Sequence, residues 1–318
     1  MKTEILSGEK KNLAIAGKLL KNSELVAFPT ETVYGLGARI SDEKAIRKVF
    51  QIKGRPPDNP LIVHISKLDS IAKVAEEIPA DFFRLQERFF PGPLTVILKK
   101  HKGLSFLITG GRDSVAIRMP HHPVAEKLIS LVGEPLAAPS ANLSGRPSPT
   151  LASHVFEDFN QYIPLILDGG PCRWGLESTV VSLLSETPHL LRPGVITSEE
   201  IEEVLQKKVQ RSSEQLAPGM KYRHYAPKAA IYTFDTLDTL LSHLQTPMER
   251  LILGKDLPVS HHTLNSRDLY YHFRMADAKG YKEICIFLDP QIKKQEALMN
   301  RIFKASYDPC YKTSFSLL

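Results

Sequence analysis

The chain has 318 residues, 42% of them hydrophobic and 24% charged, and a formal net charge of +6, all typical of a globular protein. Its three cysteines are scattered, which excludes a disulfide framework and a zinc ribbon and fits a reducing compartment. No apolar run approaches the roughly 18–20 residues of a membrane span, and residues 1–12 lack a signal-peptide core, so we expect a cytoplasmic protein.

The first predicted elements lead into a loop rich in hydroxyl groups. Residues 12–20 have the spacing of a helix, and residues 25–28 form an apolar run that predicts a buried strand. The stretch 29–37 (PTETVYGLG) then crowds hydroxyls, a tyrosine and two glycines after that strand. This composition indicates a loop whose backbone approaches a ligand. It lacks the third glycine and the downstream acid of a dinucleotide fingerprint.

A second helix is predicted to end at a lysine. Apolar residues recur at helical spacing over 45–50, Ser41 is the expected N-cap, and Gly54 suits the end of the helix. Lys53 therefore lies in the last turn. A lysine at a helix end is often a solvated residue that the helix dipole favours, and this alternative stays open here.

Arg55 and Asn59 follow in a loop stiffened by prolines, and His64 lies in the apolar strand beyond it. Prolines reduce the conformational freedom of the loop, so the cation and the amide are held in place. Fixed positive charge beside a polar amide suits a phosphate-bearing ligand.

Residues 71–90 show helical patterns, and residues 94–98 read as a strand. The segment 114–119 then alternates with period two, which puts Ser114 and Arg118 on one face and apolar residues on the core face. An arginine that points outward from a half-exposed strand is an equally common alternative.

Two further polar stretches follow. His121 and His122 are adjacent on an extended segment, so they point to opposite faces, and no cysteine or carboxylate cluster completes a metal site. In 139–145 (PSANLSG) small residues leave room for a ligand, while Ser140 and Asn142 offer a hydroxyl and an amide. Ordinary turns use the same residue types. Ser148 lies between prolines in another constrained loop.

Strands are predicted at 163–167 and 177–181, with Arg192 at the end of another.

The composition of the chain changes after about residue 201. Residues 206–228 read as a linker with an unusually aromatic and basic end. Beyond it, strands near 230–232, 251–253 and 283–288 alternate with helices, the last over 292–304, which predicts a small open α/β domain.

Together these stretches resemble the threonylcarbamoyl-AMP synthase family, over roughly residues 8–205. The motifs that carry the resemblance are PTETVYGLG (29–37), KGRP (53–56), PL (60–61), SVAIR (114–118), PSAN with SG (139–145), EST (177–179) and RPG (192–194). In the tail, HYAP (224–227) and ALMNR (297–301) resemble the longer form of the family. The resemblance implies an α/β protein with a YrdC-like twisted mixed-sheet domain (1–205) bearing a concave basic site. It also implies a linker (206–228) and a small Rossmann-like α/β domain (229–318) after that first domain.

The resemblance also implies roles for individual residues. The L-threonine contacts that it implies are Thr32, His64, Arg118, Ala138 and Ser178. The implied ATP contacts are Arg55, Asn59, Ser114, Ser140, Asn142, Ser148, Arg192 and the linker residue Tyr225. Lys53 and Arg55 carry the implied catalytic role, which is to neutralise phosphate charge. No side chain is expected to bind a metal directly.

The implied enzyme is a nucleotidyltransferase. It converts L-threonine, bicarbonate or CO₂, and ATP into threonylcarbamoyl-AMP and pyrophosphate, with Mg²⁺ held mainly through the ATP phosphates. A tRNA threonylcarbamoyl transferase is the implied downstream partner, and a weak RNA contact is possible because the net charge is mildly basic. Two alternatives are an RNA-binding module and a carbamoyl-transfer relative of the hydrogenase-maturation type.

Overall fold

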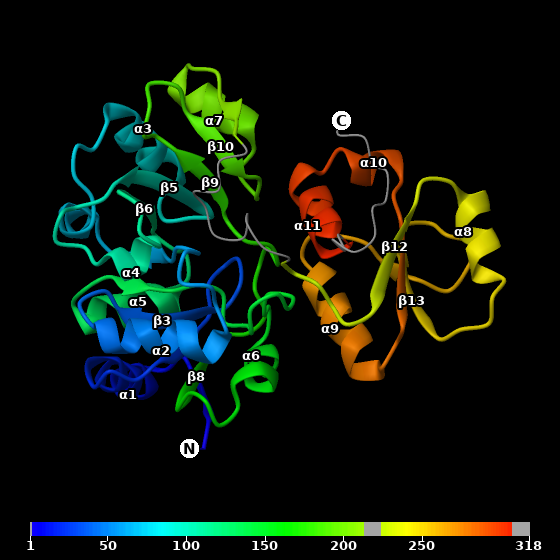
Figure 1. The fold of residues 1–318 in the computed structure, drawn as a ribbon, viewed down its shortest axis with the longest axis horizontal. Coiled ribbons are helices and arrows are strands. Elements are labelled where there is room, and N and C mark those ends of the chain that lie inside the picture. The colour runs from blue at the N-terminus through cyan, green and yellow to red at the C-terminus, as the bar shows by residue number, and fades with distance from the viewer. Residues whose placement is uncertain (1, 213–223, 307–318) are drawn as a thin grey trace. The chain divides into compact units, whose positions relative to one another are not determined.

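The computed structural model describes residues 2–212 and 224–306 and divides into two compact units (Figure 1). The first unit holds Met1–Ser144 and Ser148–Lys221, and the second holds Tyr222–Leu318 together with the short segment Gly145–Pro147. Among the described residues, no helix is both long enough and apolar enough to cross a membrane.

Within residues 2–212, the first unit is built on a mixed sheet of eleven strands in the order β1-β8-β2-β3-β7-β4-β6-β5-β9-β10-β11. Both parallel and antiparallel pairs occur within it, which confirms the predicted mixed sheet. Its strands are β1 (Glu4–Ser7), β2 (Val26–Phe28), β3 (Gly35–Arg39), β4 (Ile62–His64), β5 (Leu94–Lys99), β6 (Ser114–Arg118), β7 (Leu136–Ala137), β8 (Leu165–Asp168), β9 (Thr179–Ser182), β10 (His189–Arg192) and β11 (Gln210–Arg211).

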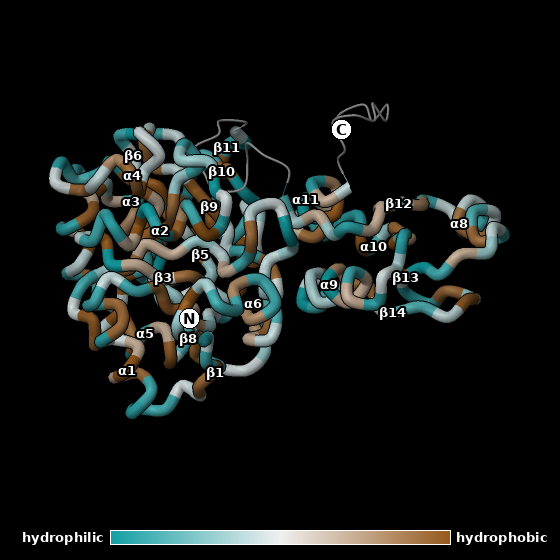
Figure 2. Tube along the Cα trace, turned by 60° about the horizontal axis from the view of Figure 1, so that its bottom comes forward, coloured by the Kyte–Doolittle hydropathy of each residue, from teal (hydrophilic) through white to brown (hydrophobic). Residues whose placement is uncertain are grey.

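Helices join these strands. They are α1 (Lys10–Lys21), α2 (Glu43–Lys53), the 3-10 helix η1 (Leu68–Lys73), α3 (Ala80–Phe89), α4 (Phe106–Thr109), α5 (Pro123–Val132), α6 (Ala152–Phe159) and α7 (Ser198–Leu205). Apolar segments, brown in Figure 2, run through the interior of the unit. The helices α1 and α5 pack together with β2 and β8 in one apolar cluster. The helices α2, α3, α6 and α7 belong to a larger cluster with the middle strands.

The alternation along β6 sorts its side chains between two apolar clusters. Val115 and Ile117 belong to the large core, whereas Ala116 belongs to a small separate cluster with Ile62 and Val180. The period-two prediction for this strand is therefore confirmed, and the smaller cluster lies on the face that also carries Arg118.

The start of α2 differs from the sequence prediction. Asp42, not Ser41, is the N-cap, and its carboxylate accepts a hydrogen bond from the backbone N–H of Ala45. The Ser41 hydroxyl instead donates to Glu134. Both residue types cap helices well, and the tertiary contact to Glu134 decides between them. The end of α2 is as predicted, since Gly54 adopts a left-handed conformation with φ of 59°.

Part of the range predicted as a linker belongs to the sheet of the first unit. Within it, β11 pairs parallel to β10, with Gln210 opposite His189. The predicted linker residues 213–223 lie outside the described residues.

In the described part of the second unit, a four-stranded parallel sheet in the order β12-β15-β13-β14 packs with helices α8 (Leu237–Leu244), α9 (Leu269–Lys279), α10 (Pro290–Lys293) and α11 (Glu296–Ser306). Its strands are β12 (Ala230–Phe234), β13 (Arg250–Gly254), β14 (His262–Thr263) and β15 (Glu283–Phe287). The predicted small open α/β domain is confirmed. The single last helix predicted over 292–304 is instead two helices, because Asp289 caps α10 as a separate short turn before α11 begins.

Candidate active site

A row of side chains crosses neighbouring strands of the first unit. His64 at the end of β4 lies opposite Arg118 at the end of β6, and the antiparallel register of β5, continued by one residue, brings Thr95 next to Arg118. Val180 in β9 lies opposite both Thr95 and Arg192. Residues in one row of a sheet point to the same face, so four strand ends deliver polar side chains to one place.

Arg118 is the centre of this row. It is 3% exposed, so the alternative of an outward-pointing arginine is wrong. Its Nη1 donates to Thr32 Oγ1 at 2.8 Å, and its Nε donates to the carbonyl of Gly92 at 3.2 Å. Its Nη2 lies 2.8 Å from Oε1 of Glu31, a buried acid in the same loop as Thr32. The structure thus joins two of the predicted threonine contacts, Arg118 and Thr32, directly.

His64 is held in the neutral form beside this guanidinium. Burial, together with the positive charge of Arg118, lowers the pKa of His64 to about 3. Its Nδ1 lies 3.3 Å from the carbonyl oxygen of Ile62, and its ring meets Phe28 edge to face. A neutral imidazole offers one donor and one acceptor, so His64 suits a hydroxyl better than an anion.

Ser178 and Arg192 form one hydrogen-bonded group with Thr95. The two hydroxyls of Thr95 and Ser178 lie 2.7 Å apart. Arg192 donates through Nε and Nη2 to the carbonyl of Ser178, at 3.1 and 3.0 Å, and through Nη2 to its hydroxyl at 3.1 Å. A predicted threonine contact and a predicted ATP contact are therefore neighbours, and Arg192 fixes the backbone of Ser178.

Lys53 is buried, with 2% exposure, so the alternative of a solvated helix end is wrong. Its ammonium donates to the carbonyl oxygens of Ser140, at 2.6 Å, and Asn142. The backbone N–H of Ser144 returns a hydrogen bond to the carbonyl of Lys53 at 2.8 Å. Lys53 thereby ties the end of α2 to the PSAN stretch, which contains two of the predicted ATP contacts.

Arg55 shapes its own loop. Its guanidinium donates to the carbonyl and the side-chain oxygen of Asn59, at 3.0 and 2.8 Å, and to the carbonyl of Pro60 at 2.6 Å. The parallel register of β4 and β6, continued backwards, places Ser114 beside Pro60. Three predicted ATP contacts, Arg55, Asn59 and Ser114, therefore lie around one loop.

The remaining predicted contacts of the first unit are also buried. Ser148 Oγ donates to Oε1 of Glu177 at 2.5 Å. The backbone N–H of Ala138 donates to the carbonyl of Ile62 at 2.9 Å, which holds Ala138 beside the strand that ends at His64.

Tyr225 belongs to the second unit. Its ring stacks on Tyr270 with centroids 5.5 Å apart, and the guanidinium of Arg301 lies 5.3 Å from the ring centroid. It has a positive φ of 66°, an uncommon conformation for a bulky residue. The prediction that Tyr225 contacts nucleotide stays a prediction.

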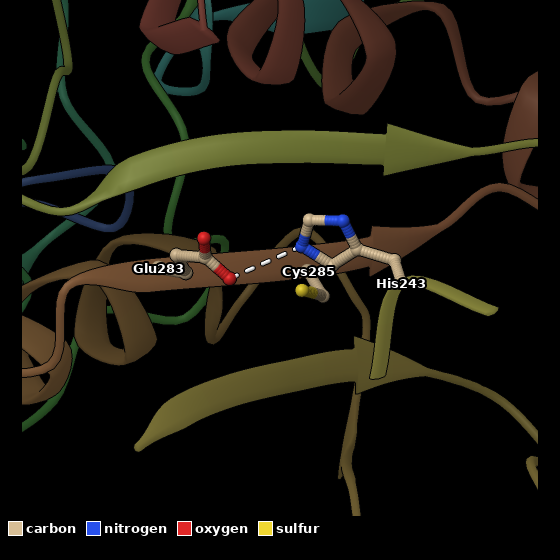
Figure 3. A group of neighbouring side chains, drawn as sticks. All are labelled: His243, Glu283 and Cys285. Atoms are coloured by element: carbon tan, nitrogen blue, oxygen red, sulfur yellow. Dashed lines mark hydrogen bonds and ion pairs between the residues drawn. The ribbon is translucent and has the colours of Figure 1, made fainter. Parts of the chain in front are cut away.

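Two groups of potential metal ligands, one around His122 and one around His243, make other contacts in this structure. His122 caps α5, since its Nδ1 accepts a hydrogen bond from the backbone N–H of Val124. In the second unit, His243, Glu283 and Cys285 approach one another closely enough to be metal ligands (Figure 3). However, Nε of Arg250 lies 3.5 Å from the same Oε2 of Glu283 that contacts His243, at 3.1 Å. That carboxylate already has a cationic partner, which disfavours a metal there.

Sequence reasoning missed three polar residues of the site: Glu31, Thr95 and Glu177. The two acids lie inside the motifs PTETVYGLG and EST, next to residues with a predicted role. The usable signal was that a carboxylate flanked by buried residues needs a specific partner, which Arg118 and Ser148 supply. Thr95 carries no such signal, because a threonine in a strand is ordinary.

Two family models cover most of the chain. Residues 18–194 match the Sua5_yciO_yrdC family, described as telomere recombination, and residues 196–306 match the C-terminal domain of threonylcarbamoyl-AMP synthase. Threonylcarbamoyl-AMP synthase of Pyrococcus abyssi is 51% identical over 233 residues, covering 70% of this chain and 68% of the relative. Its counterpart in Bacillus subtilis is 47% identical over 249 residues, with 76% and 72% covered.

A solved structure agrees with these relatives. The crystal structure of P. abyssi Sua5 complexed with L-threonine superposes with a TM-score of 0.89 at 40% identity, covering 96% of this chain and 98% of that one. The structure of Escherichia coli YciO, at 22% identity and a TM-score of 0.57 over 63% of this chain and 99% of that one, shares the fold of the first unit. With both family models matched in order along its sequence, the chain belongs to the threonylcarbamoyl-AMP synthase family in its two-domain, Sua5-type form.

Proposed function

We propose that this protein is a threonylcarbamoyl-AMP synthase, an enzyme that joins L-threonine, bicarbonate or CO₂, and ATP to give threonylcarbamoyl-AMP and pyrophosphate. The product would serve a transferase that modifies tRNA. The observation that carries the proposal is the buried Arg118–Thr32 contact within the row of strand ends, in a chain that aligns over nearly its full length with an L-threonine-bound relative.

The polar side chains at the strand ends suit the binding of L-threonine. A guanidinium such as Arg118 grips a carboxylate through two parallel hydrogen bonds. The neutral imidazole of His64 and the hydroxyls of Thr32 and Ser178 can bind the side-chain hydroxyl or the amine of threonine. Ala138 borders the same strand end with a small side chain, which leaves room for the substrate.

The loops around Lys53 and Arg55 suit the binding of ATP and the transfer to its α-phosphorus. A carbamate oxygen must attack the α-phosphorus of ATP, so two anions have to meet. Positive charge and fixed donors lower that barrier, and no covalent nucleophile is needed. Arg55 and Asn59 lie in one loop, Ser140 and Asn142 in another, and Arg192 completes the donors next to Ser178. This supports a nucleotidyltransferase.

Mg²⁺ enters this proposal as part of the nucleotide substrate. The ion prefers to keep several waters and to bind one or two carboxylates with substrate phosphates. The donors predicted to contact ATP are guanidinium groups, hydroxyls and amides. We therefore assign Mg²⁺ to the phosphates of ATP.

An RNA-binding module is the less favoured function. Buried arginines such as Arg118 and Arg192, each tied to a neighbouring hydroxyl, differ from the exposed cations that bind a phosphate backbone.

The deciding experiment measures pyrophosphate release by the purified full-length protein. Release should require ATP, L-threonine, bicarbonate and Mg²⁺ together. Release that proceeds equally with ATP alone, or with RNA in place of threonine, would contradict the proposal. L-serine should be a poor substrate rather than a rejected one, because one methyl group discriminates by only about 1–3 kcal/mol.

A further inference from the structure

Glu31 is a buried carboxylate to which the proposed chemistry has so far given no role. It is 5% exposed, and its Oε1 lies 2.8 Å from Nη2 of Arg118. The contact is an ion pair and does not have the geometry of a hydrogen bond. As a result, both carboxylate oxygens of Glu31 and Nη2 of Arg118 lack a hydrogen-bond partner among the described residues.

A buried ion pair whose atoms make no hydrogen bond is costly, so its presence in a native structure calls for an explanation. Here the unused capacity is complementary. Arg118 retains N–H donors, which suit an anion, and Glu31 retains two acceptor oxygens, which suit a cation. The two groups lie side by side, so the missing ligand carries both charges close together, for example on two groups bonded to one carbon atom. An α-amino acid in its zwitterionic form fits that description.

We propose that Glu31 binds the ammonium group of threonine and accepts a proton from it, an inference that rests on the proposed function. Before substrate binds, Glu31 neutralises Arg118. On binding, the substrate carboxylate takes the guanidinium and the substrate ammonium takes the carboxylate. Two ion pairs replace one, and no net charge enters the buried site.

The proton transfer follows from the chemistry of the amine. An ammonium group has no lone pair, so it cannot attack the carbon of CO₂. One N–H bond breaks, its electron pair becomes the lone pair of the amine, and one O–H bond forms on Glu31. The summed charge of substrate and Glu31 is unchanged by this step. Bicarbonate or CO₂, the co-reactant of the proposed function, then meets a neutral amine.

The groups around Glu31 are compatible with this role. Arg118 faces it from β6, His122 from the start of α5, and Cys172 from the segment after β8. Burial lowers the pKa of His122 below its ordinary value, and burial together with the charge of Glu31 raises the pKa of Cys172. Both side chains therefore stay neutral near pH 7, and among these described neighbours Arg118 is the cation that pairs with Glu31.

Binding measurements on the full-length protein test the recognition step. Calorimetry without ATP should compare L-threonine with 3-hydroxybutyrate, which has the same carboxylate and hydroxyl but no ammonium. The wild type should prefer threonine by roughly 10- to 100-fold, the effect of one charge-assisted contact. E31Q should lose most of that preference while it still binds the shared carboxylate. E134Q is the matched control, because Glu134 pairs with Arg39 at the far end of β3, and it should keep the wild-type preference.

Turnover tests the proton transfer. Pyrophosphate release by E31Q should fall by about 10²- to 10⁴-fold near neutral pH, the usual contribution of a general base. The loss should shrink as the pH rises through the pKa of free threonine's ammonium, since solution then supplies the neutral amine. E31D, which keeps a carboxylate one methylene shorter, should keep the threonine preference with reduced turnover, and it serves if E31Q does not fold.

The opposite results overturn the inference. If Glu31 is only a counter-ion for Arg118, E31Q binds threonine more tightly, keeps the preference over 3-hydroxybutyrate and turns over within a few fold of wild type. E31D with wild-type turnover has the same meaning. If the wild type releases no pyrophosphate with threonine, the proposed function fails, whereas the binding comparison still decides whether Glu31 recognises an ammonium group.

Discussion

The ammonium of Lys53 lies 2.6 Å from the carbonyl oxygen of Ser140, so the last residue of α2 holds the backbone of a loop 87 positions further along the chain. A second hydrogen bond to the carbonyl of Asn142 fixes the same loop. Lys53 thereby sets the shape of the loop that presents the Ser140 hydroxyl and the Asn142 amide.

Replacing Lys53 by methionine should therefore weaken ATP binding and lower stability. Each lost hydrogen bond from a charged donor is worth about 1.5–3 kcal/mol, so the KM for ATP should rise at least tenfold. The matched control is K48M, which removes a part-exposed lysine of α2 that pairs with Glu24. Wild-type kinetics for K53M would show that the Ser140 loop keeps its shape without the lysine.

Arg118 and Glu31 should be coupled in stability. R118Q leaves the carboxylate of Glu31 buried without its cation, which costs about 3–5 kcal/mol. Adding E31Q removes the orphaned charge and should restore most of that loss without restoring activity. Urea unfolding is the measurement, followed by the fluorescence of Trp174, the single tryptophan of the chain, which lies in the first unit. Additive losses in the double variant would mean that the two side chains do not interact.

Arg192 should affect both substrates. It holds the carbonyl of Ser178 through two nitrogens, and a lysine cannot reproduce that planar fork. R192K should raise the KM for threonine as well as for ATP, each by a few fold to about tenfold, because the lysine keeps the positive charge and loses only part of the hydrogen bonding. Steady-state kinetics with each substrate varied in turn provides the test. A change confined to ATP would limit Arg192 to the nucleotide.

His64 should make the first unit less stable in acid. Its pKa is about 3 in the folded protein and near 6.5 when unfolded, so the unfolded chain binds the extra proton. The stability that the neutral form contributes is complete above pH 6.5 and is lost as the pH falls towards 3, at about 1.4 kcal/mol per pH unit. Unfolding monitored through Trp174 between pH 7 and 4 should show this slope in the wild type. The slope should be reduced in H64Q, because glutamine does not titrate.

The sequence predicted the residue types of the site better than their contacts. Arg118 and Ser114 were placed on one face of a strand because period two is a local rule, and the apolar clusters confirm it. The pairing of Lys53 with Ser140, or of Arg118 with Glu31, depends on which strands become neighbours. No local pattern encodes that choice, since β4 lies between β7 and β6 rather than beside β3 or β5.

A local sequence pattern also cannot choose between two adjacent residues that both suit the N-cap of a helix. Ser41 and Asp42 both suit an N-cap, and the contact of Ser41 with Glu134, 93 residues away, settles the matter. The burial of Lys53 is another such case. A lysine at a helix end is usually solvated, and only the arrival of the Ser140 loop makes it a buried donor.

The strand order also has a consequence for how the protein is made. The first strand, β1, pairs with β8, so Glu4 cannot form its strand pairing until Leu165 has been synthesised. The polar row is complete only when Arg192 has been added. At synthesis rates of about 5–20 residues per second, the ribosome needs roughly 10–40 s to extend the chain from Glu4 to Arg192. During that time β1 and β2 have unpaired edges that chaperones or other chains can bind, so the sheet and its site form late in synthesis.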